Sequence, residues 1–137
     1  MKISMYLASS MDGYIARPDG DIAWLGNTDE ELQDYGYKEF YASIDCLVMG
    51  GKTFRQIRTS HEWFYAGKPT WVYTRGDFVA DIPDVYHTAE LPDNLVGRLR
   101  KEGKTHLWVL GGGEIHSLFL RRALVDEIRL FVMSDII

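Results

Sequence analysis

Residues 106–122 read HLWVLGGGEIHSLFLRR, and this stretch decides the fold. A buried-type strand from His106 to Leu110 runs into three consecutive glycines, and a helical pattern follows from Glu114 to about Arg122. Glycines remove every side chain from such a strand-to-helix turn, so a flat or charged ligand can approach the backbone closely. The stretch therefore predicts a strand, a ligand-binding turn and a helix. The alternative is a turn made of glycine for tight packing alone.

A second glycine turn lies earlier in the chain. The short apolar strand 46–49 ends at Gly50-Gly51, and a helix restarts over 52–57. The sequence Gly-Lys-Thr resembles the end of a phosphate-binding P-loop, but the glycine that a P-loop needs five residues before Gly51 is Cys46 here. Neither glycine turn has the G-x-G-x-x-G spacing of a Rossmann domain. Free backbone donors at the helix start still favour a phosphate, and a plain turn is the alternative.

The other segments alternate between strand and helix patterns. Turn signals at Asp12-Gly13 and Pro18-Asp19-Gly20 predict a long loop after the first strand, which is a candidate lid. Alternating strands and helices indicate an α/β protein with a mostly parallel sheet and ligands at the carboxyl ends of its strands. We expect one domain over 1–137. The further predicted elements are strands at 2–9, 70–74 and 127–133 and helices at 28–43, with a Thr28–Glu31 capping box, and 91–101.

Composition limits the function classes. The 137 residues are 46% hydrophobic and 26% charged, which is typical of a globular domain, and no apolar run reaches the ~20 residues of a membrane span. No signal-peptide pattern opens the chain, so we expect a cytoplasmic protein that does not bind membranes. The net charge of −5 argues against a nucleic-acid partner. The single cysteine, Cys46, excludes an internal disulfide and is interpreted as a buried small hydrophobe.

One segment departs from this acidic balance. Residues 52–75 carry a net charge of +4, because this segment contains one acid, Glu62, and five cations: Lys52, Arg55, Arg58, Lys68 and Arg75. A solvated surface patch is one interpretation of this segment. The other is a binding site for a small phosphorylated ligand.

Several chemistries lack their required residues. A zinc deaminase needs H-x-E and C-x-x-C, and one cysteine cannot supply them. No G-x-S-x-G elbow is present for a serine hydrolase. The four histidines, His61, His87, His106 and His116, lack metal-ligand spacing, so we interpret them as structural or surface residues and expect no metal.

Three stretches resemble a known family: 8–16 (ASSMDGYIA), 48–54 (VMGGKTF) and 109–115 (VLGGGEI). They are similar to dihydrofolate reductases and, more closely, to the reductase domain of bifunctional riboflavin-biosynthesis deaminase-reductases. The resemblance implies a dihydrofolate-reductase-like three-layer sandwich. It also implies a C-terminal hairpin after the last strand, whereas this sequence stops at Ile137. We therefore expect either a truncated sequence or a second subunit, as in a homodimer, that covers this edge.

The resemblance also implies an NADPH site. The triple-glycine turn would approach the pyrophosphate and nicotinamide, and a cis peptide bond would join Gly111 to Gly112. The earlier glycine turn and the end of the next strand would hold the adenosine end, with Arg75 on the 2′-phosphate. Gly51 replaces a basic residue of dihydrofolate reductases, so the preference for NADPH over NADH would rest on Lys52 and Arg75. The implied cofactor residues are Ala8, Ile15, Ala16, Gly51, Lys52, Thr53, Thr74, Arg75, Leu110, Gly111, Gly112, Gly113, Glu114 and Ile115.

The implied reaction is hydride transfer from NADPH to a pteridine-like or ribosyl-pyrimidine-like small molecule. In riboflavin-type reductases the aspartate of the Asp-Gly turn faces the substrate, which makes Asp12 the first catalytic candidate. Asp34, at the position of the pterin-binding carboxylate of dihydrofolate reductases, is the second. Two alternatives stay open. One is that the chain is an NADPH-binding module without turnover. The other is that it is a structural homo-oligomer that binds no cofactor.

Overall fold

The computed structural model describes residues 1–9, 36–60, 63–74 and 81–132. Within them, no helix is long and apolar enough to cross a membrane. The strands are β1 (Lys2–Ser9), β2 (Cys46–Gly50), β3 (Thr70–Tyr73), β4 (Val85–Thr88), β5 (His106–Gly111) and β6 (Glu127–Val132). The helices are α2 (Tyr37–Ser43), α3 (Gly51–Ser60), α4 (Pro92–Lys101) and α5 (Gly113–Arg121).

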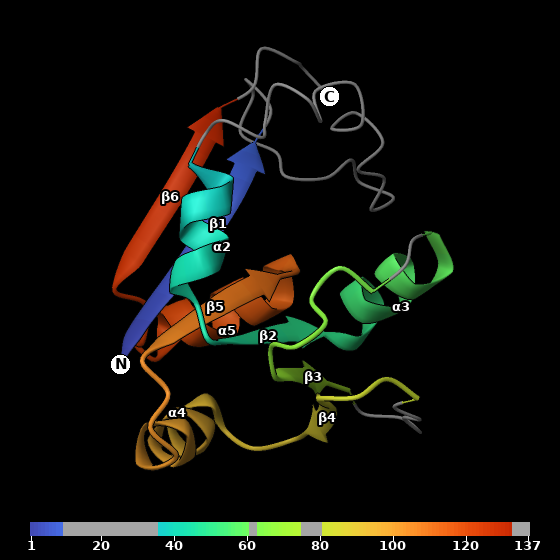
Figure 1. The fold of residues 1–137 in the computed structure, drawn as a ribbon. Coiled ribbons are helices and arrows are strands. Elements are labelled where there is room, and N and C mark those ends of the chain that lie inside the picture. The colour runs from blue at the N-terminus through green and yellow to red at the C-terminus, as the bar shows by residue number, and fades with distance from the viewer. Residues whose placement is uncertain (10–35, 61–62, 75–80, 133–137) are drawn as a thin grey trace.

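The strands form one sheet in the order β4-β3-β2-β5-β1-β6, and every pair is parallel. β1 pairs with β5 only from Lys2 to Ser4, whereas it stays paired with β6 as far as Ser9. β1 and β6 therefore diverge from β5 and β2 toward their carboxyl ends (Figure 1). Ligands of open parallel sheets bind at the carboxyl ends of the strands, so this divergence opens the sheet on its functional side.

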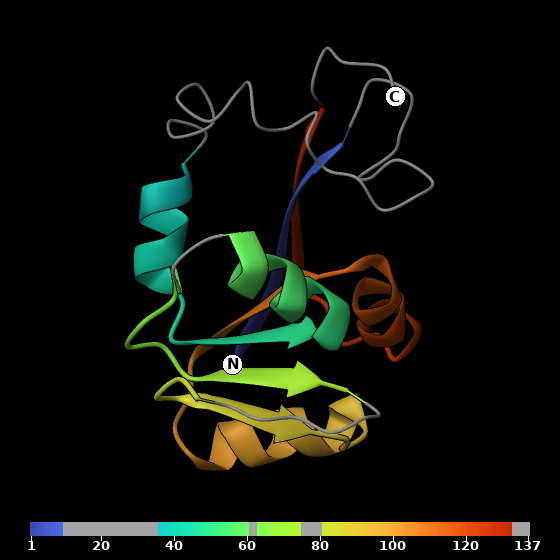
Figure 2. The same cartoon turned by 90° about the vertical axis from the view of Figure 1, so that its right-hand side faces the viewer.

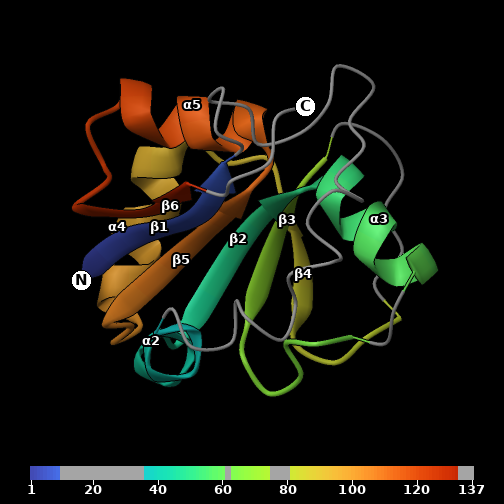
Figure 3. The same cartoon turned by 90° about the horizontal axis from the view of Figure 1, so that it is seen from above.

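Helices cover both faces of the sheet, with α4 and α5 on one face and α2 and α3 on the other (Figure 3). Each face has its own buried cluster because neighbouring residues of a strand point to opposite sides. Val48 and Val109 pack under α4 and α5, while Leu47 and Trp108 pack toward α2 and α3. The predicted three-layer α/β architecture is confirmed, and the sheet is parallel throughout the described residues.

Most predicted elements are found within one or two residues of their expected bounds, but one expectation was wrong and one strand was not predicted. The predicted helix over 28–43 does not run continuously, because Gly36 has φ +80 and precedes α2 as its N-cap. A residue in the left-handed backbone conformation interrupts a right-handed α-helix. The sequence analysis also missed β4. This edge strand is only four residues long, and only its two end residues, Val85 and Thr88, are buried.

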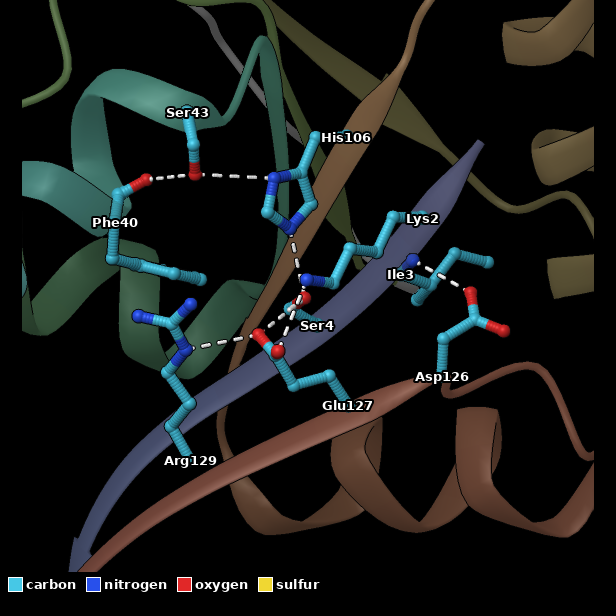
Figure 4. Close-up of polar contacts among 9 residues, drawn as sticks. All are labelled: Lys2, Ile3, Ser4, Phe40, Ser43, His106, Asp126, Glu127 and Arg129. Atoms are coloured by element: carbon cyan, nitrogen blue, oxygen red, sulfur yellow. Dashed lines mark hydrogen bonds and ion pairs between the residues drawn. The ribbon is translucent and has the colours of Figure 1, made fainter.

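A partly buried polar cluster links β1, β5, β6 and α2 at the amino ends of the strands (Figure 4). The His106 ring lies between two serines, with Nε2 2.8 Å from Ser4 Oγ and Nδ1 3.2 Å from Ser43 Oγ. Ser43 donates its hydroxyl hydrogen to the Phe40 carbonyl, so it accepts from His106 Nδ1–H. Burial, assisted by the Lys2 ammonium, lowers the pKa of His106. His106 thus links β5 to β1 and to α2.

Asp45 fixes the start of β5. Its carboxylate accepts hydrogen bonds from the backbone N–H groups of Thr105 (2.8 Å) and His106 (3.0 Å) and from the Thr105 hydroxyl (3.1 Å). Burial by itself would raise the pKa of this carboxyl, but these hydrogen bonds outweigh it and lower the pKa below its ordinary value.

We predict that Asp45→Asn lowers the free energy of unfolding by about 1–2 kcal/mol at pH 7, because one or more charged hydrogen bonds are lost. The folded-state pKa lies below the unfolded one, so the stabilisation is present above about pH 4 and is lost as the pH falls through the folded value. Urea unfolding at pH 7 and pH 3 measures both effects. Asp84→Asn, at an exposed turn, is the control and should change stability by less than about 0.5 kcal/mol. An Asp45→Asn deficit that is equally large at pH 3 would contradict the assignment.

Candidate functional site

A groove of about 1100 Å³ lies at the carboxyl ends of the strands, between α3 and α5. It is lined by the start of α3, by α5 from Gly113 to Arg121, and by residues at the ends of β3 and β4. Figure 2 shows α3 and α5 on either side of the strand ends. The lining residues are Gly51, Lys52, Arg55, Tyr73, Thr74, Thr88, Ala89, Gly113, Glu114, Ile115, Ser117, Leu118 and Arg121.

Two helix N-termini meet at this groove. α3 begins at Gly51 directly after β2, and α5 begins at Gly113 directly after β5 and the residue Gly112. The first N–H groups of a helix have no partner within the helix, and together with the helix dipole they attract anions. No side chain caps α5 at Gly112, so the N–H groups of its first turn are available to a ligand.

The glycines of the two turns have no side chains, so the turns can lie close together. A Cβ atom on Gly50 would lie 3.1 Å from Ile115 Cγ1, and one on Gly112 would lie 3.4 Å from Thr53 Oγ1. A Cβ atom on Gly51 would lie 3.2 Å from both Arg55 Nη1 and Thr74 Cβ. The glycines therefore bring the start of α3 against the start of α5.

The groove carries an excess of positive charge. Lys52 and Arg55 on α3 and Arg121 on α5 line it, against one lining acid, Glu114. Within the described part of the chain, none of these three cations forms an ion pair, whereas Arg58, one turn further along α3, is paired with Asp81 at 3.0 Å. Lys52 and Arg55 lie at the start of α3, whereas Arg121 ends α5. Cations without acidic partners near a helix N-terminus favour a ligand with phosphate groups.

A neighbouring acid is neutralised by its own partner. Glu90 accepts from Arg98 at 2.6 Å and from the Thr88 hydroxyl at 3.2 Å. The hydrogen bond from Arg98 is the main reason that the pKa of Glu90 is lowered. Tyr73 keeps its phenol proton, because burial raises its pKa. The charge of Glu90 therefore opposes an anion in the groove less than an unpaired carboxylate would.

The structure gathers many of the expected cofactor residues. Six of them line the groove: Gly51, Lys52, Thr74, Gly113, Glu114 and Ile115. Thr53 and Gly112 face each other at the meeting of the two turns, and Leu110 and Gly111 end β5 beside them. The peptide bond between Gly111 and Gly112 is cis, as the resemblance implied.

The remaining candidates are not tested by this geometry. Ala8 lies near the end of β1, opposite Phe131 of β6 in the register, and is separated from β5 by the divergence of the strands. The other five lie outside the described residues: Asp12, Ile15, Ala16, Asp34 and Arg75.

Sequence reasoning missed several residues of the groove. Arg55 was counted only as part of a cationic segment, although it lies one helical turn after Lys52 and shares its face. Thr88 and Ala89 were missed together with β4. Ser117, Leu118 and Arg121 carry no sequence signal, because helical periodicity does not show which exposed face of a helix borders a groove.

Comparisons with known proteins agree with this geometry. The family model described as "RibD C-terminal domain" matches residues 1–137. The Bacillus subtilis (strain 168) protein YwjB, described as uncharacterized, is 29% identical over 137 residues, which cover 99% of this chain and 78% of YwjB.

Solved structures with a similar fold include the following two. A putative riboflavin biosynthesis protein from Shewanella sp. PV-4 is 25% identical with a TM-score of 0.86, and the match covers 99% of this chain and 78% of that one. A Thermotoga maritima diaminohydroxyphosphoribosylaminopyrimidine deaminase/5-amino-6-(5-phosphoribosylamino)uracil reductase is 18% identical with a TM-score of 0.73, and the match covers 98% of this chain and 45% of that one. The second likeness supports the fold. Taken with the match of the family model over the whole sequence, the three-layer fold and its glycine turns identify this chain as a member of the RibD C-terminal domain family, the dihydrofolate-reductase-like reductase domain.

Proposed function

We propose that this chain is an NADPH-dependent reductase that transfers hydride to a pteridine-like or ribosyl-pyrimidine-like small molecule. The observation that carries the proposal is the groove at the carboxyl ends of the strands, which is lined by two helix N-termini and by three cations that have no acidic partner among the described residues. NADPH supplies the hydride when bound, and the protein contributes binding, orientation and electrostatics.

The groove has backbone and side-chain groups that suit the phosphates of a dinucleotide. The backbone N–H groups at the start of α5 would donate to the pyrophosphate, and Gly113 has open space where a side chain would obstruct it. Lys52, at the start of α3, would neutralise part of its charge. Thr74, at the end of β3, borders the adenosine end of the groove.

Arg55 provides a way to recognise the 2′-phosphate. The absence of a side chain at Gly51 leaves room for the Arg55 guanidinium, whose Nη1 atom would be 3.2 Å from a Cβ atom there. Arg55 thus places a guanidinium beside the position where dihydrofolate reductases have a basic residue. Together with Arg75, it supports a preference for NADPH over NADH, since the two cofactors differ by that phosphate.

The substrate would lie beyond the triple-glycine turn, where β1 separates from β5. Asp12 remains our candidate for binding or protonating it, with Asp34 in reserve. An NADPH-binding module without turnover is the second candidate function, because the groove accounts for binding without specifying a substrate.

The first prediction concerns turnover. The purified protein should oxidise NADPH in the presence of at least one member of a panel of oxidised pteridines and ribosylamino-pyrimidines, measured by the loss of absorbance of the reduced nicotinamide. Binding of NADPH without oxidation across the panel would favour the module. Absence of binding would exclude both functions.

The second prediction concerns the 2′-phosphate. Arg55→Ala should weaken NADPH binding roughly 10- to 100-fold, as expected for the loss of a charged hydrogen bond, and should leave NADH binding within about 3-fold. Arg75→Ala should act in the same direction. Isothermal titration calorimetry measures both cofactors. Arg58→Ala, on the same helix but paired with Asp81, is the matched control and should leave both affinities unchanged. Equal weakening of NADPH and NADH by Arg55→Ala would refute this role.

The third prediction concerns Asp12. Asp12→Asn should lower turnover by about 100-fold, the lower end of what a positioned proton donor or acceptor contributes, and should keep the NADPH affinity within a few-fold. Unchanged turnover would show that Asp12 serves only its turn, and Asp34→Asn would then be the variant to measure.

The proposal also includes a single domain, a cytoplasmic location and a homodimer. Light scattering coupled to size-exclusion chromatography tests the last point. A dimer has twice the 15.7 kDa mass of this chain.

A further inference from the structure

The pairing of β5 with β2 shifts by one residue at the end of β5, next to the triple-glycine turn, and we refer to this irregularity as the bulge. Val48 of β2 is opposite Val109, but the next residue, Met49, is opposite Gly111. Two steps along β5 thus match one step along β2, and Leu110 is the extra residue. A bulge disrupts the ladder locally and leaves the backbone of its extra residue without a regular ladder partner. Buried carbonyl groups require a partner from elsewhere.

The His116 side chain provides that partner. Its Nε2 atom lies 3.1 Å from the Leu110 carbonyl oxygen and 3.2 Å from the Val109 carbonyl oxygen. Both oxygens can only accept, so Nε2 carries the hydrogen and donates to both. The backbone N–H of His116 donates to the Gly112 carbonyl at 3.0 Å. One residue of α5 therefore holds the turn at both of its ends.

The His116 ring also fits the shape of the turn. Gly111 has φ +138, a conformation that favours glycine, and a Cβ atom there would lie 3.1 Å from His116 Cε1. The ring thus occupies the space beside the Gly111 Cα atom, and His116 is only 7% exposed. Burial outweighs the two carbonyl contacts and lowers the pKa of His116. The neutral ring also suits the first turn of a helix, where a cation is disfavoured.

His116 does not line the groove, whereas Gly113, Glu114 and Ile115 do. We infer that His116 is a positioning residue, which holds the bulge and the triple-glycine turn from behind so that the backbone N–H groups at the start of α5 face the groove. This inference rests on the proposed function, because it assigns those N–H groups to the pyrophosphate. It adds a residue that the family resemblance did not indicate.

The test compares two variants and two ligands. His116→Phe keeps a flat ring beside Gly111 and removes the N–H donor, whereas His116→Gln keeps a side-chain N–H at similar reach. The ligands are NADPH and 2′,5′-ADP, a fragment that has the adenosine end without the pyrophosphate bridge and nicotinamide. Calorimetry gives the affinities, and thermal unfolding gives the stability of each variant.

His116→Phe should weaken NADPH binding roughly 10- to 100-fold, because two buried carbonyls lose their donor and the turn is no longer held. Binding of 2′,5′-ADP should stay within about 3-fold, because that fragment would contact α3 and the end of β3 and not the start of α5. His116→Gln should recover NADPH binding to within about 3-fold of the wild type. A merely structural role would lower both affinities together with the unfolding temperature, and that result, or unchanged NADPH binding in His116→Phe, would overturn the inference.

Nitrogen NMR of the wild-type imidazole separates this inference from the proposed function. If Nε2–H donates to the two carbonyl groups, the ring should show a slowly exchanging Nε2–H and an unprotonated Nδ1 at pH 7, with or without cofactor. The Nδ1–H tautomer or rapid exchange would overturn the inference even if NADPH binds or if His116→Phe fails to fold. If the wild-type protein binds neither ligand but gives these NMR signals, both the proposed function and the positioning role are wrong. His116 would then support the bulge alone.

Discussion

The close approach of two strand-to-helix turns is the constraint on which the rest of this structure depends. At Gly50 a methyl group would lie 3.1 Å from the Ile115 side chain, and at Gly112 it would lie 3.4 Å from the Thr53 hydroxyl. With larger residues the start of α3 could not lie against the start of α5. Because the turns meet, the first N–H groups of both helices lie beside one groove, and the same contact fixes where α3 and α5 leave the sheet.

Charge is distributed around this contact in a consistent way. The whole chain has a net charge of −5, and ion pairs such as Arg58–Asp81 and Arg98–Glu90 occupy several of its cations. Lys52, Arg55 and Arg121 are different, because they border the groove without an acidic partner in the described residues. Exposed ion pairs contribute little to stability, so they matter here mainly because they neutralise cations elsewhere on the surface. The cations without acidic partners leave a positive charge beside the groove.

The sequence predicted much of this architecture because its local signals agree with the global fold. The bounds of β1 were predicted to the residue, and Pro92 and Gly103 marked the ends of α4. The glycine turns indicated a ligand site, and the structure placed six of the implied cofactor residues around one groove. What failed depends on tertiary context. The strand β4 is too short for a periodic signal, and Gly36 ends a helical pattern through its backbone conformation alone. Arg55 and His116 gain their roles from contacts that helical periodicity does not show: Arg55 lies beside Gly51 at the groove, and His116 lies beside the bulge at Leu110.

The central claim is that the groove between α3 and α5 binds the cofactor, and NMR titration of the 15N-labelled protein with NADP⁺ tests it directly. Saturable shifts of the backbone signals of Gly51, Thr74, Gly113 and Ser117 are predicted, because these residues line the groove from α3, the end of β3 and α5. Signals at the amino ends of the strands, around Lys2 and Thr105, should not move. A titration that leaves the groove signals unshifted, or one that shifts residues on another surface, would contradict the account.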